Sequence, residues 1–381
     1  MKVGIVVPFS WSFWGAVVEH AEMQAAALEE IGHDVRLIMG NDPPGQFTRA
    51  LHPRVGRHGD PPANVIPVGR SVIVPANGSL PNIVLSPRTW ARIRRALERE
   101  RFDVLHLHEP MTPVICVATL VLARVPMVGT FHASGDLGWM RLGTPVWGFL
   151  PERLDYRIAV SERARSSQQR WLPGEYDVIP NGVLVPAAAP AGGREHRVVF
   201  AGRQEPRKGL HVLLAAWPEI HRRSGLRLTV AGADPLAVRL LLTRLRVRDE
   251  GIDVVGFLSQ EELSETLLRA KALIAPSLGQ ESFGMVLTRA FACALPAVAS
   301  DIPGYREVLD PDASVAVPPG DTRLLADAVC ELVADEPRRE RLGQKARELA
   351  VERYSWPVIA ERLSSIYEQV TVIGRREARA A

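Results

Sequence analysis

Short apolar runs alternate with segments of helical periodicity along most of the chain. KVGIVVPF near the start and HDVRLIMG after it are apolar enough for strands buried on both faces. In residues 16–31, which lie between these two runs, apolar side chains recur every three to four positions, as on one face of a helix. Such alternation predicts βαβ units and a parallel sheet that binds ligands at the carboxyl ends of its strands.

This pattern occurs twice, which indicates two domains. The first series of apolar runs ends near residue 180, and a Pro/Ala/Gly-rich stretch follows at 186–196. A second series then runs through RVVFAGR, LRLTVAGA, IDVVGFL, ALIAPSL and PAVAS. We therefore expect two doubly wound α/β domains, 1–185 and 186–355, with a ligand bound between them. The final helix, within 356–381, is expected to pack back toward the N-terminal domain.

The stretch ESFGMVLTRAFACALPAVASD, residues 281–301, predicts a helix that begins at Glu281 and ends before Pro296. The backbone N–H groups of its first turn, around Ser282, Phe283 and Gly284, would lie at the positive end of the helix dipole and suit a phosphate. Gly284 would let a ligand approach the backbone closely. The alternative is an ordinary αβ unit whose first turn happens to hold a carboxylate.

Composition excludes several classes of protein. The net charge of +3 is too small to indicate nucleic-acid binding, and no apolar run approaches the 18 residues of a membrane span. The first apolar run is short and reads as a strand, not a signal peptide. The three cysteines lie in apolar segments without C-x-x-C spacing, so we expect neither a disulfide framework nor a zinc site, and a reducing compartment such as the cytoplasm. We also expect no cofactor.

Lysine is the unusual basic residue in this chain. Arginine supplies 42 of the 46 basic residues, yet Lys208 joins Arg203 in the loop after the strand RVVFAGR. Two cations at the carboxyl end of a strand can neutralise a diphosphate. The alternative is an ordinary solvated, charged loop. A lysine in a chain that otherwise uses arginine argues against this alternative.

Four motifs together resemble those of a known enzyme family. The chain resembles the family 4 retaining glycosyltransferases of the GT-B fold through four motifs and their order along the chain. They are D-V-L-H-L-H-E-P at 103–110, P-N-G-V at 180–183, G-R-x4-K-G at 202–209 and E-S-F-G at 281–284. The resemblance covers essentially the whole chain. VPFS near the start, NGS at 77–79, TFHAS at 130–134 and EPRKG at 205–209 are most similar to the actinobacterial phosphatidylinositol mannosyltransferases.

The resemblance implies a fold and a reaction. The fold would be two Rossmann-like domains that face a central cleft. A hexose, mannose from GDP-mannose being one case, would move with retention from a GDP- or UDP-linked donor to an acceptor hydroxyl of a phosphatidylinositol-like or other lipid. The leaving phosphate oxygen would help to deprotonate the acceptor, and no metal ion would be required.

The resemblance also implies roles for single residues. Arg203 and Lys208 would hold the donor diphosphate, His132 would contact the transferred sugar, and Glu281 would bind a sugar hydroxyl. The base would lie against residues 256–258. The donor site as a whole would comprise Gly15, Ala16, Arg203, Lys208, Gly256, Phe257, Leu258, Glu281, Ser282, Phe283, Gly284 and Arg289. His106 and His108 alternate on a strand and so face the same side. Either can be a structural residue, and neither is assigned a role in the site.

Two positions depart from the family pattern. Arg289 stands where the family has a second glutamate, and Ala16 stands where it has a glycine. A carboxylate accepts from ribose hydroxyls whereas a guanidinium only donates, so weaker or altered donor binding is expected. One alternative is therefore a glycosyltransferase-like protein that binds a sugar nucleotide or a partner without turnover. A GT-B phosphorylase or sugar-nucleotide epimerase is a second alternative.

The acceptor side also differs from the mannosyltransferases. The segment after NGS reads LPNIVLS, without charge, where theirs is basic. The helix that follows carries Arg88, Arg92, Arg94, Arg95 and Arg99, which would lie on anionic lipid at the inner membrane face or form a solvated helix face with Glu98 and Glu100. Lipid-contacting or core aromatic residues are expected at Trp11, Phe13, Trp14, Trp139 and Trp147.

Overall fold

The computed structural model of the 381-residue chain describes residues 1–52, 57, 59–74, 82–86, 88–133, 149–187 and 193–380. The NGS motif at 77–79, Ser134 of TFHAS, Trp139 and Trp147 lie outside these residues. The chain divides into two compact units, which we call unit 1 (Met1–Gly182 with Trp356–Ala381) and unit 2 (Val183–Ser355). Within the described residues, no helix combines the length and the apolar character that crossing a bilayer requires.

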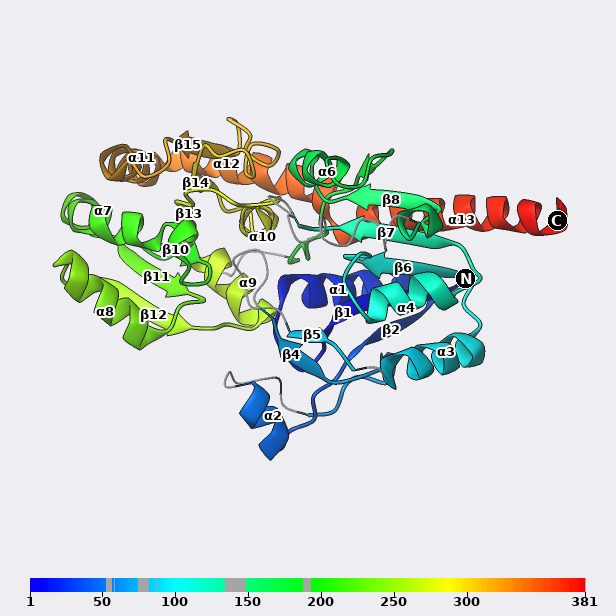
Figure 1. The fold of residues 1–381 in the computed structure, drawn as a ribbon. Coiled ribbons are helices and arrows are strands. Elements are labelled where there is room, and N and C mark those ends of the chain that lie inside the picture. The colour runs from blue at the N-terminus through cyan, green and yellow to red at the C-terminus, as the bar shows by residue number, and fades with distance from the viewer. Residues whose placement is uncertain are drawn as a thin grey trace. The chain divides into compact units, whose positions relative to one another are not determined.

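Unit 1 is built on a sheet whose main path has the order β3-β2-β1-β6-β7-β8-β9, with every neighbouring pair parallel. Figure 1 labels β1, β2, β6, β7 and β8 of this path. The strand order reverses between β1 and β6. The short strands β4 and β5 extend the sheet in an antiparallel sense. The bounds are β1 (Lys2–Ser10), β2 (Asp34–Gly40), β3 (Val65–Pro67), β4 (Ser71–Ile73), β5 (Asn82–Val84), β6 (Val104–His108), β7 (Met127–Phe131), β8 (Tyr156–Ala159) and β9 (Asp177–Val178).

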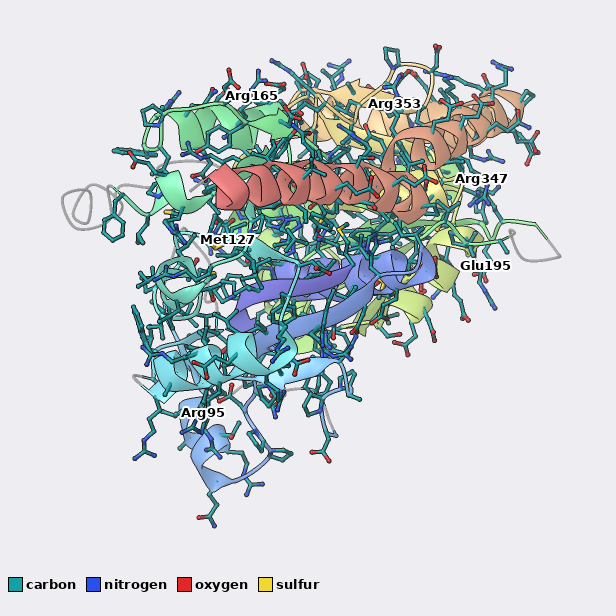
Figure 2. All side chains as sticks on the ribbon, turned by 90° about the vertical axis from the view of Figure 1, so that its right-hand side faces the viewer. Arg95, Met127, Arg165, Glu195, Arg347 and Arg353 are labelled. Atoms are coloured by element: carbon teal, nitrogen blue, oxygen red, sulfur yellow. The ribbon has the colours of Figure 1, made fainter. Side chains whose placement is uncertain are left out.

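Helices cover both faces of this sheet. They are α1 (Ala16–Glu30), α2 (Gln46–Leu51), α3 (Arg88–Glu100), α4 (Ile115–Leu122), α6 (Glu162–Gln169), α13 (Trp356–Ala380) and the 3-10 turn Pro151–Arg153. The C-terminal helix α13 lies beside α1 (Figure 2), and its Ile359, Leu363 and Tyr367 share one buried core with Leu28 of α1. The last helix of the chain therefore completes the fold of unit 1.

Unit 2 has a six-stranded sheet of order β12-β11-β10-β13-β14-β15, also parallel throughout. Its strand order reverses between β10 and β13. The strands are β10 (Arg197–Ala201), β11 (Arg227–Ala231), β12 (Ile252–Gly256), β13 (Ala272–Ala275), β14 (Ala297–Ser300) and β15 (Ser314–Val317). The helices are α7 (Leu210–Ser224), α8 (Pro235–Leu245), α9 (Gln260–Arg269), α10 (Met285–Ala292), α11 (Thr322–Ala334) and α12 (Glu336–Leu349), with a 3-10 turn Pro206–Lys208 and a π-helical turn Ala350–Tyr354.

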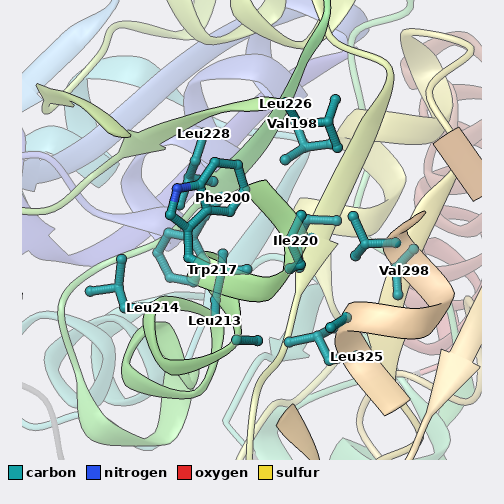
Figure 3. Packing of buried hydrophobic residues seen from close by; sticks show 14 of the residues in the cluster. Val198, Phe200, Leu213, Leu214, Trp217, Ile220, Leu226, Leu228, Val298 and Leu325 are labelled. Atoms are coloured by element: carbon teal, nitrogen blue, oxygen red, sulfur yellow. The ribbon is translucent and has the colours of Figure 1, made fainter. Parts of the chain in front are cut away.

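The core of unit 2 fixes the strand and the helix on either side of a candidate loop. Phe200 of β10 and Leu213 and Trp217 of α7 are buried in one cluster (Figure 3). The Trp217 indole N–H also donates to the carbonyl of Glu250 at 2.9 Å, so its one polar atom is satisfied. Because both ends of the loop 202–209 are anchored in this core, its cations are held at the carboxyl end of β10.

The two doubly wound α/β sheets expected from the sequence are confirmed, but the predicted start of one helix is wrong. Helix α10 begins at Met285, four residues after Glu281. Gln280 and Gly284 have φ angles of 58° and 89°, and left-handed residues cannot continue a right-handed helix. A Cβ at Gly284 would lie 2.8 Å from the Tyr305 ring, so the glycine is required by the backbone and by this ring.

The core of unit 2 predicts different losses of stability for the same leucine-to-alanine substitution at a buried and at an exposed position. Leu213 of α7 is fully buried, whereas Leu240 of α8 is 64% exposed. Leu213→Ala is expected to lower the free energy of unfolding by about 2–5 kcal/mol through lost burial and a cavity. Leu240→Ala should change it by less than about 0.5 kcal/mol. Urea unfolding followed by circular dichroism measures both, and equal effects would contradict the packing described for α7.

Candidate functional site

The candidate residues of each unit lie at the carboxyl ends of strands next to the reversal in strand order. In unit 2 these are the loops after β10 and β13, which carry Lys208 and Glu281. In unit 1 they are the segments after β1 and β7, which carry Gly15 and His132, and the last residue of β6, His108. Open parallel sheets bind ligands at such a switch point.

In unit 2, three donors converge on one carboxylate oxygen, and we call this group the Glu281 cluster. Glu281 Oε1 lies 2.7 Å from Lys208 Nζ and 3.2 Å from Arg207 Nη1, and Ser277 Oγ donates to it at 3.3 Å. Glu281 is only 8% exposed, and a buried carboxylate is stable only when it is paired in this way. The cluster is therefore a preformed arrangement of charge at the end of β13.

A close backbone contact brings the two loops of the cluster together. Gly209 has a φ angle of 71°, and a Cβ there would lie 1.8 Å from the carbonyl oxygen of Pro276. The N–H of Leu278 donates to the carbonyl of Arg207 at 2.7 Å. Because only glycine fits this contact, the turn Pro206–Lys208 lies directly against the loop after β13, and Lys208 reaches Glu281.

Tyr305 supports the cluster from behind. Its hydroxyl lies 2.8 Å from Ser277 Oγ, and the residue is 1% exposed. Burial, followed by the nearby charge of Glu281, raises the pKa of the phenol, so it stays neutral and can donate to Ser277. Sequence reasoning missed Ser277 and Tyr305. Neither stands in a recognisable motif, whereas Arg207 could have been chosen from EPRKG.

The remaining donor-site candidates of unit 2 have different environments. Half of the Arg203 side chain is exposed, and its guanidinium pairs with Glu205 at 3.0 Å. At the end of β12, Gly256 has a φ angle of 72° and Phe257 is 75% exposed. Phe283, in contrast, is buried against Tyr354. Leu258, Ser282 and Arg289 are partly buried, Arg289 within α10.

In unit 1, Gly15 caps the N-terminus of α1 in an extended conformation. A Cβ at Gly15 would have no neighbour within 4 Å, and Ala16 after it is exposed. The methyl group of Ala16 therefore causes no clash within unit 1. Of the aromatic candidates nearby, Trp11 and Phe13 are core residues, while Trp14 is 58% exposed with the Arg57 guanidinium 4.2 Å from its ring centre.

Four histidines gather around the ends of β6 and β7, and we call them the histidine cluster. The ring centres of His20, His108 and His132 are 5.0 to 5.4 Å apart, and His106 stacks on His108. His108 Nδ1 lies 2.8 Å from His132 Nε2. Sequence reasoning selected His132 alone. It left His106 and His108 open and missed His20, which comes from α1 and shares no local motif with them.

Burial keeps the histidine cluster neutral. Desolvation lowers the pKa of His106 to about 3 and that of His132 to about 4. The pKa values of His20 and His108 also lie well below 6.5, through burial and then through the other imidazoles. A neutral imidazole has one N–H donor and one lone pair, so each ring can both give and accept one hydrogen bond.

The loop after β7 is held by a partly buried acid. Glu109 Oε1 accepts from the backbone N–H groups of His132 and Ala133 at 2.8 and 2.7 Å. Burial raises the pKa of Glu109, and these two donors oppose the shift. The backbone of His132 is thereby fixed independently of its ring.

One nitrogen from each of His20, His108 and His132 lies within 4.8 Å of the others, close enough to hold a metal ion. The sequence predicted no such group, because its members come from three distant segments. Tetrahedral Zn²⁺ with Zn–N bonds near 2.05 Å would place ligand nitrogens about 3.3 Å apart. His108 and His132 are instead at hydrogen-bond distance. His108 Nε2 also has no partner among the described residues, whereas ligating histidines normally donate from their second nitrogen. The geometry favours a hydrogen bond.

Comparison with known proteins gives two family matches. Residues 195–335 match the family model described as Glycosyl transferases group 1, and residues 17–185 match Glycosyltransferase Family 4. The phosphatidyl-myo-inositol mannosyltransferase of Mycobacterium leprae is 34% identical, with 99% of each chain covered. The protein of the same name from Propionibacterium freudenreichii is also 34% identical, over 99% of this chain and 97% of its own.

Solved structures show the same fold. Sucrose-phosphate synthase of Thermosynechococcus elongatus has a TM-score of 0.72 at 20% identity, over 98% of this chain and 100% of its own. Anabaena Alr3699/HepE in complex with UDP has a TM-score of 0.71 at 17% identity, over 97% of this chain and 100% of its own. The GT-B fold implied by the motifs is confirmed.

The histidine cluster predicts how stability depends on pH. Unfolded histidines take up protons below about pH 6.5, whereas the folded ones resist until about pH 4 or below, so the unfolded state binds more protons in this window. The free energy of unfolding should therefore fall as the pH is lowered from 6.5 toward 4. Urea midpoints between pH 7.5 and 5 measure the fall. It should be smaller in His106→Gln, and equal stability of the parent at pH 7 and 5 would contradict the buried neutral state.

The loop contact at Gly209 predicts the outcome of a matched pair of glycine substitutions. Gly209→Ala forces a methyl group onto the Pro276 carbonyl at a positive φ angle, so about 1–3 kcal/mol of stability should be lost. At Gly202, in the same loop, the nearest atom to an added Cβ is 3.4 Å away, an ordinary contact. Gly202→Ala should therefore unfold close to the parent in the same urea titration. Equal losses would mean that the loop contact is unimportant.

Proposed function

From the premise that the chain belongs to the family 4 glycosyltransferases of the GT-B fold and transfers a sugar to an acceptor, we propose its donor and acceptor. The enzyme moves mannose, with retention, from GDP-mannose to a hydroxyl of a phosphatidylinositol-like lipid. Relatives that match over nearly the full length and are named phosphatidyl-myo-inositol mannosyltransferases support this choice.

The observation that carries the proposal is the Glu281 cluster with its lysine. Lys208 and the half-exposed Arg203 bind the donor diphosphate, whose negative charge grows as the glycosidic bond breaks. Each charge-assisted hydrogen bond contributes about 1.5–3 kcal/mol. The two cations neutralise the leaving group, so this step requires no metal ion.

Glu281 binds a hydroxyl of the transferred sugar. Its Oε1 is occupied by Lys208, Arg207 and Ser277, which orient the carboxylate before any ligand arrives. A carboxylate has about four lone-pair sites and can accept from a sugar hydroxyl in addition. Such preorganisation lowers the entropic cost of binding the donor in one orientation.

His132 contacts the transferred sugar from unit 1. A neutral imidazole suits this role, because positive charge develops on the sugar ring when a glycosidic bond breaks and an imidazolium would repel it. The acceptor oxygen forms the new bond to the anomeric carbon on the face that the phosphate leaves. The proton of the acceptor hydroxyl passes to the leaving phosphate oxygen.

Phe257 and Arg289 set how the nucleoside is held. An aromatic side chain that is 75% exposed at the end of β12 offers a stacking surface for the base. Arg289 cannot accept from ribose hydroxyls as a glutamate would, so the ribose is held less tightly. We propose weakened donor binding and not loss of turnover, in keeping with the named enzymes among the relatives.

The acceptor places the reaction at a membrane surface. Arg88, Arg92, Arg94, Arg95 and Arg99 of α3 are all exposed, and Arg95 is labelled on this helix in Figure 2. We propose that Arg88, Arg92, Arg95 and Arg99, which the helical period places on one face, bind anionic lipid at the cytoplasmic side of the membrane, each arginine adding about 1 kcal/mol of attraction. A purely solvated helix face is the alternative.

The donor assignment is tested by calorimetric titration with GDP, GDP-mannose, UDP and UDP-glucose. GDP and GDP-mannose should bind, and Lys208→Ala should weaken them by about 10- to 100-fold, the equivalent of one charge-assisted hydrogen bond. Lys345→Ala is the matched control, because Lys345 pairs with Glu348 on the surface of α12 in the same unit. Preference for UDP would overturn GDP as the nucleotide. Equal binding by the parent and Lys208→Ala would remove Lys208 from the donor site.

A further inference from the structure

We propose that His108 is a positioning residue that fixes the tautomer of His132. His108 donates from Nδ1 to His132 Nε2, so that His132 carries its own proton on Nδ1 and meets its ligand as a hydrogen-bond donor. The consequence for sugar transfer rests on the proposed role of His132. The tautomer itself can be tested without any substrate.

The distance between the two rings requires one donor and one acceptor. His108 Nδ1 and His132 Nε2 are 2.8 Å apart, an ordinary hydrogen-bond length. Both imidazoles are neutral near pH 7, because burial lowers both pKa values. Either His108 donates and His132 accepts, or the reverse. In the first case His108 Nε2 carries a lone pair, and in the second it carries a hydrogen.

The far nitrogen of His108 decides between them. His108 is fully buried, and its Nε2 has no hydrogen-bond partner in the part of the chain that the structure describes. If His108 accepted at Nδ1, Nε2 would carry a buried N–H with no acceptor, and orphaned buried N–H groups are rare. If His108 donates from Nδ1, Nε2 holds only a lone pair, the less costly deficit. Because an unpaired lone pair costs less than an unpaired buried N–H, we assign the proton to His108 Nδ1.

His106 holds the ring of His108 in place. The two rings are stacked, with centres 4.9 Å apart and planes 9° from parallel. His106 is itself tied at both nitrogens, by Tyr367 Oη at 2.5 Å and Thr130 Oγ1 at 2.6 Å. Tyr367 belongs to α13, so the C-terminal helix supports this arrangement through the core of unit 1.

The assigned tautomer limits what His132 can do. Its Nε2 is engaged as an acceptor, so this nitrogen does not take a proton from an acceptor hydroxyl. The other nitrogen, Nδ1, bears the hydrogen and can only donate while the ring is neutral. Asn181 lies beside this ring and raises its pKa, and the buried Asn181 Oδ1 has no hydrogen-bond partner within the described ranges. We infer that this oxygen accepts a hydrogen bond from His132 Nδ1–H in the free enzyme.

The test is the protonation pattern of His132, read from the ring nitrogens by NMR of the full chain labelled with ¹⁵N-histidine. The His132 signals are assigned by their loss in His132→Asn. In the parent at pH 7.5 we expect protonated Nδ1 and bare Nε2. His108→Leu should mix the two tautomers. His108→Asn should restore the parent pattern, because the Asn amide N–H can take the place of Nδ1–H.

His52→Leu is the matched control. His52 is a buried imidazole of the same unit with Nε2 bonded to the Ser71 carbonyl at 3.0 Å and Nδ1 without a partner among the described atoms. Its loss should leave the His132 signals unchanged. Unchanged signals in His108→Leu, or a parent His132 protonated on Nε2, would overturn the proposal.

A kinetic arm separates positioning from folding. With GDP-mannose and phosphatidylinositol vesicles, His108→Leu should lower kcat by about two- to tenfold, as expected for one hydrogen bond, with KM for the donor little changed. His108→Asn should recover most of kcat. A parent without activity on these substrates would sink the donor and acceptor assignment, while the NMR result would still decide the tautomer. A fall in His108→Leu that Asn does not rescue would count against positioning.

Discussion

The ion pair between Lys208 and Glu281 depends on two loops of unit 2 that touch through their backbones. Gly209 lies against the Pro276 carbonyl where no other residue fits, and this contact brings the lysine within 2.7 Å of a nearly buried carboxylate. An unpaired carboxylate at that depth would be strongly destabilising, so the pair also holds the loops closed. A phosphate that binds Lys208 competes with Glu281 for the same cation. If the donor diphosphate binds Lys208 as proposed, Arg207 and Ser277 would still hold the Glu281 carboxylate in place.

Unit 1 solves the opposite electrostatic problem. Its candidate site is built from imidazoles that burial keeps neutral, and the hydrogen bonds around them are made between uncharged groups. Unit 2 instead gathers full charges around Glu281, where we propose that the diphosphate is neutralised. Glycosyl transfer asks for this division, because negative charge grows on the leaving group while the sugar ring becomes positive. In the proposed site, neutral donors near the sugar and cations near the phosphate would meet both needs.

The sequence predicted what local pattern controls, and it failed where distant segments meet. Apolar runs and helical spacing gave the two parallel sheets, and the rarity of lysine singled out Lys208. His20, Ser277 and Tyr305 could not be found, because their partners lie elsewhere in the chain and no local spacing records the contact. The start of α10 was predicted too early because its periodicity extends through Glu281, whereas the positive φ angle of Gly284 is a backbone property that sequence periodicity does not show.

In the proposed site, Arg289 in place of a glutamate shifts where donor affinity must come from. A nucleotide sugar can be held at its base, ribose, diphosphate and sugar, and the loss of hydroxyl acceptors at the ribose leaves the other three. In the proposed site, the exposed ring of Phe257 would hold the base, the cations of the loop after β10 the diphosphate, and the oriented carboxylate of Glu281 the sugar. Because contacts to a diphosphate are electrostatic, the part of the affinity that the cations supply weakens as the ionic strength rises. In the proposed site, the cations of the Lys208 loop therefore carry a larger share of donor binding than they would beside a ribose-binding glutamate.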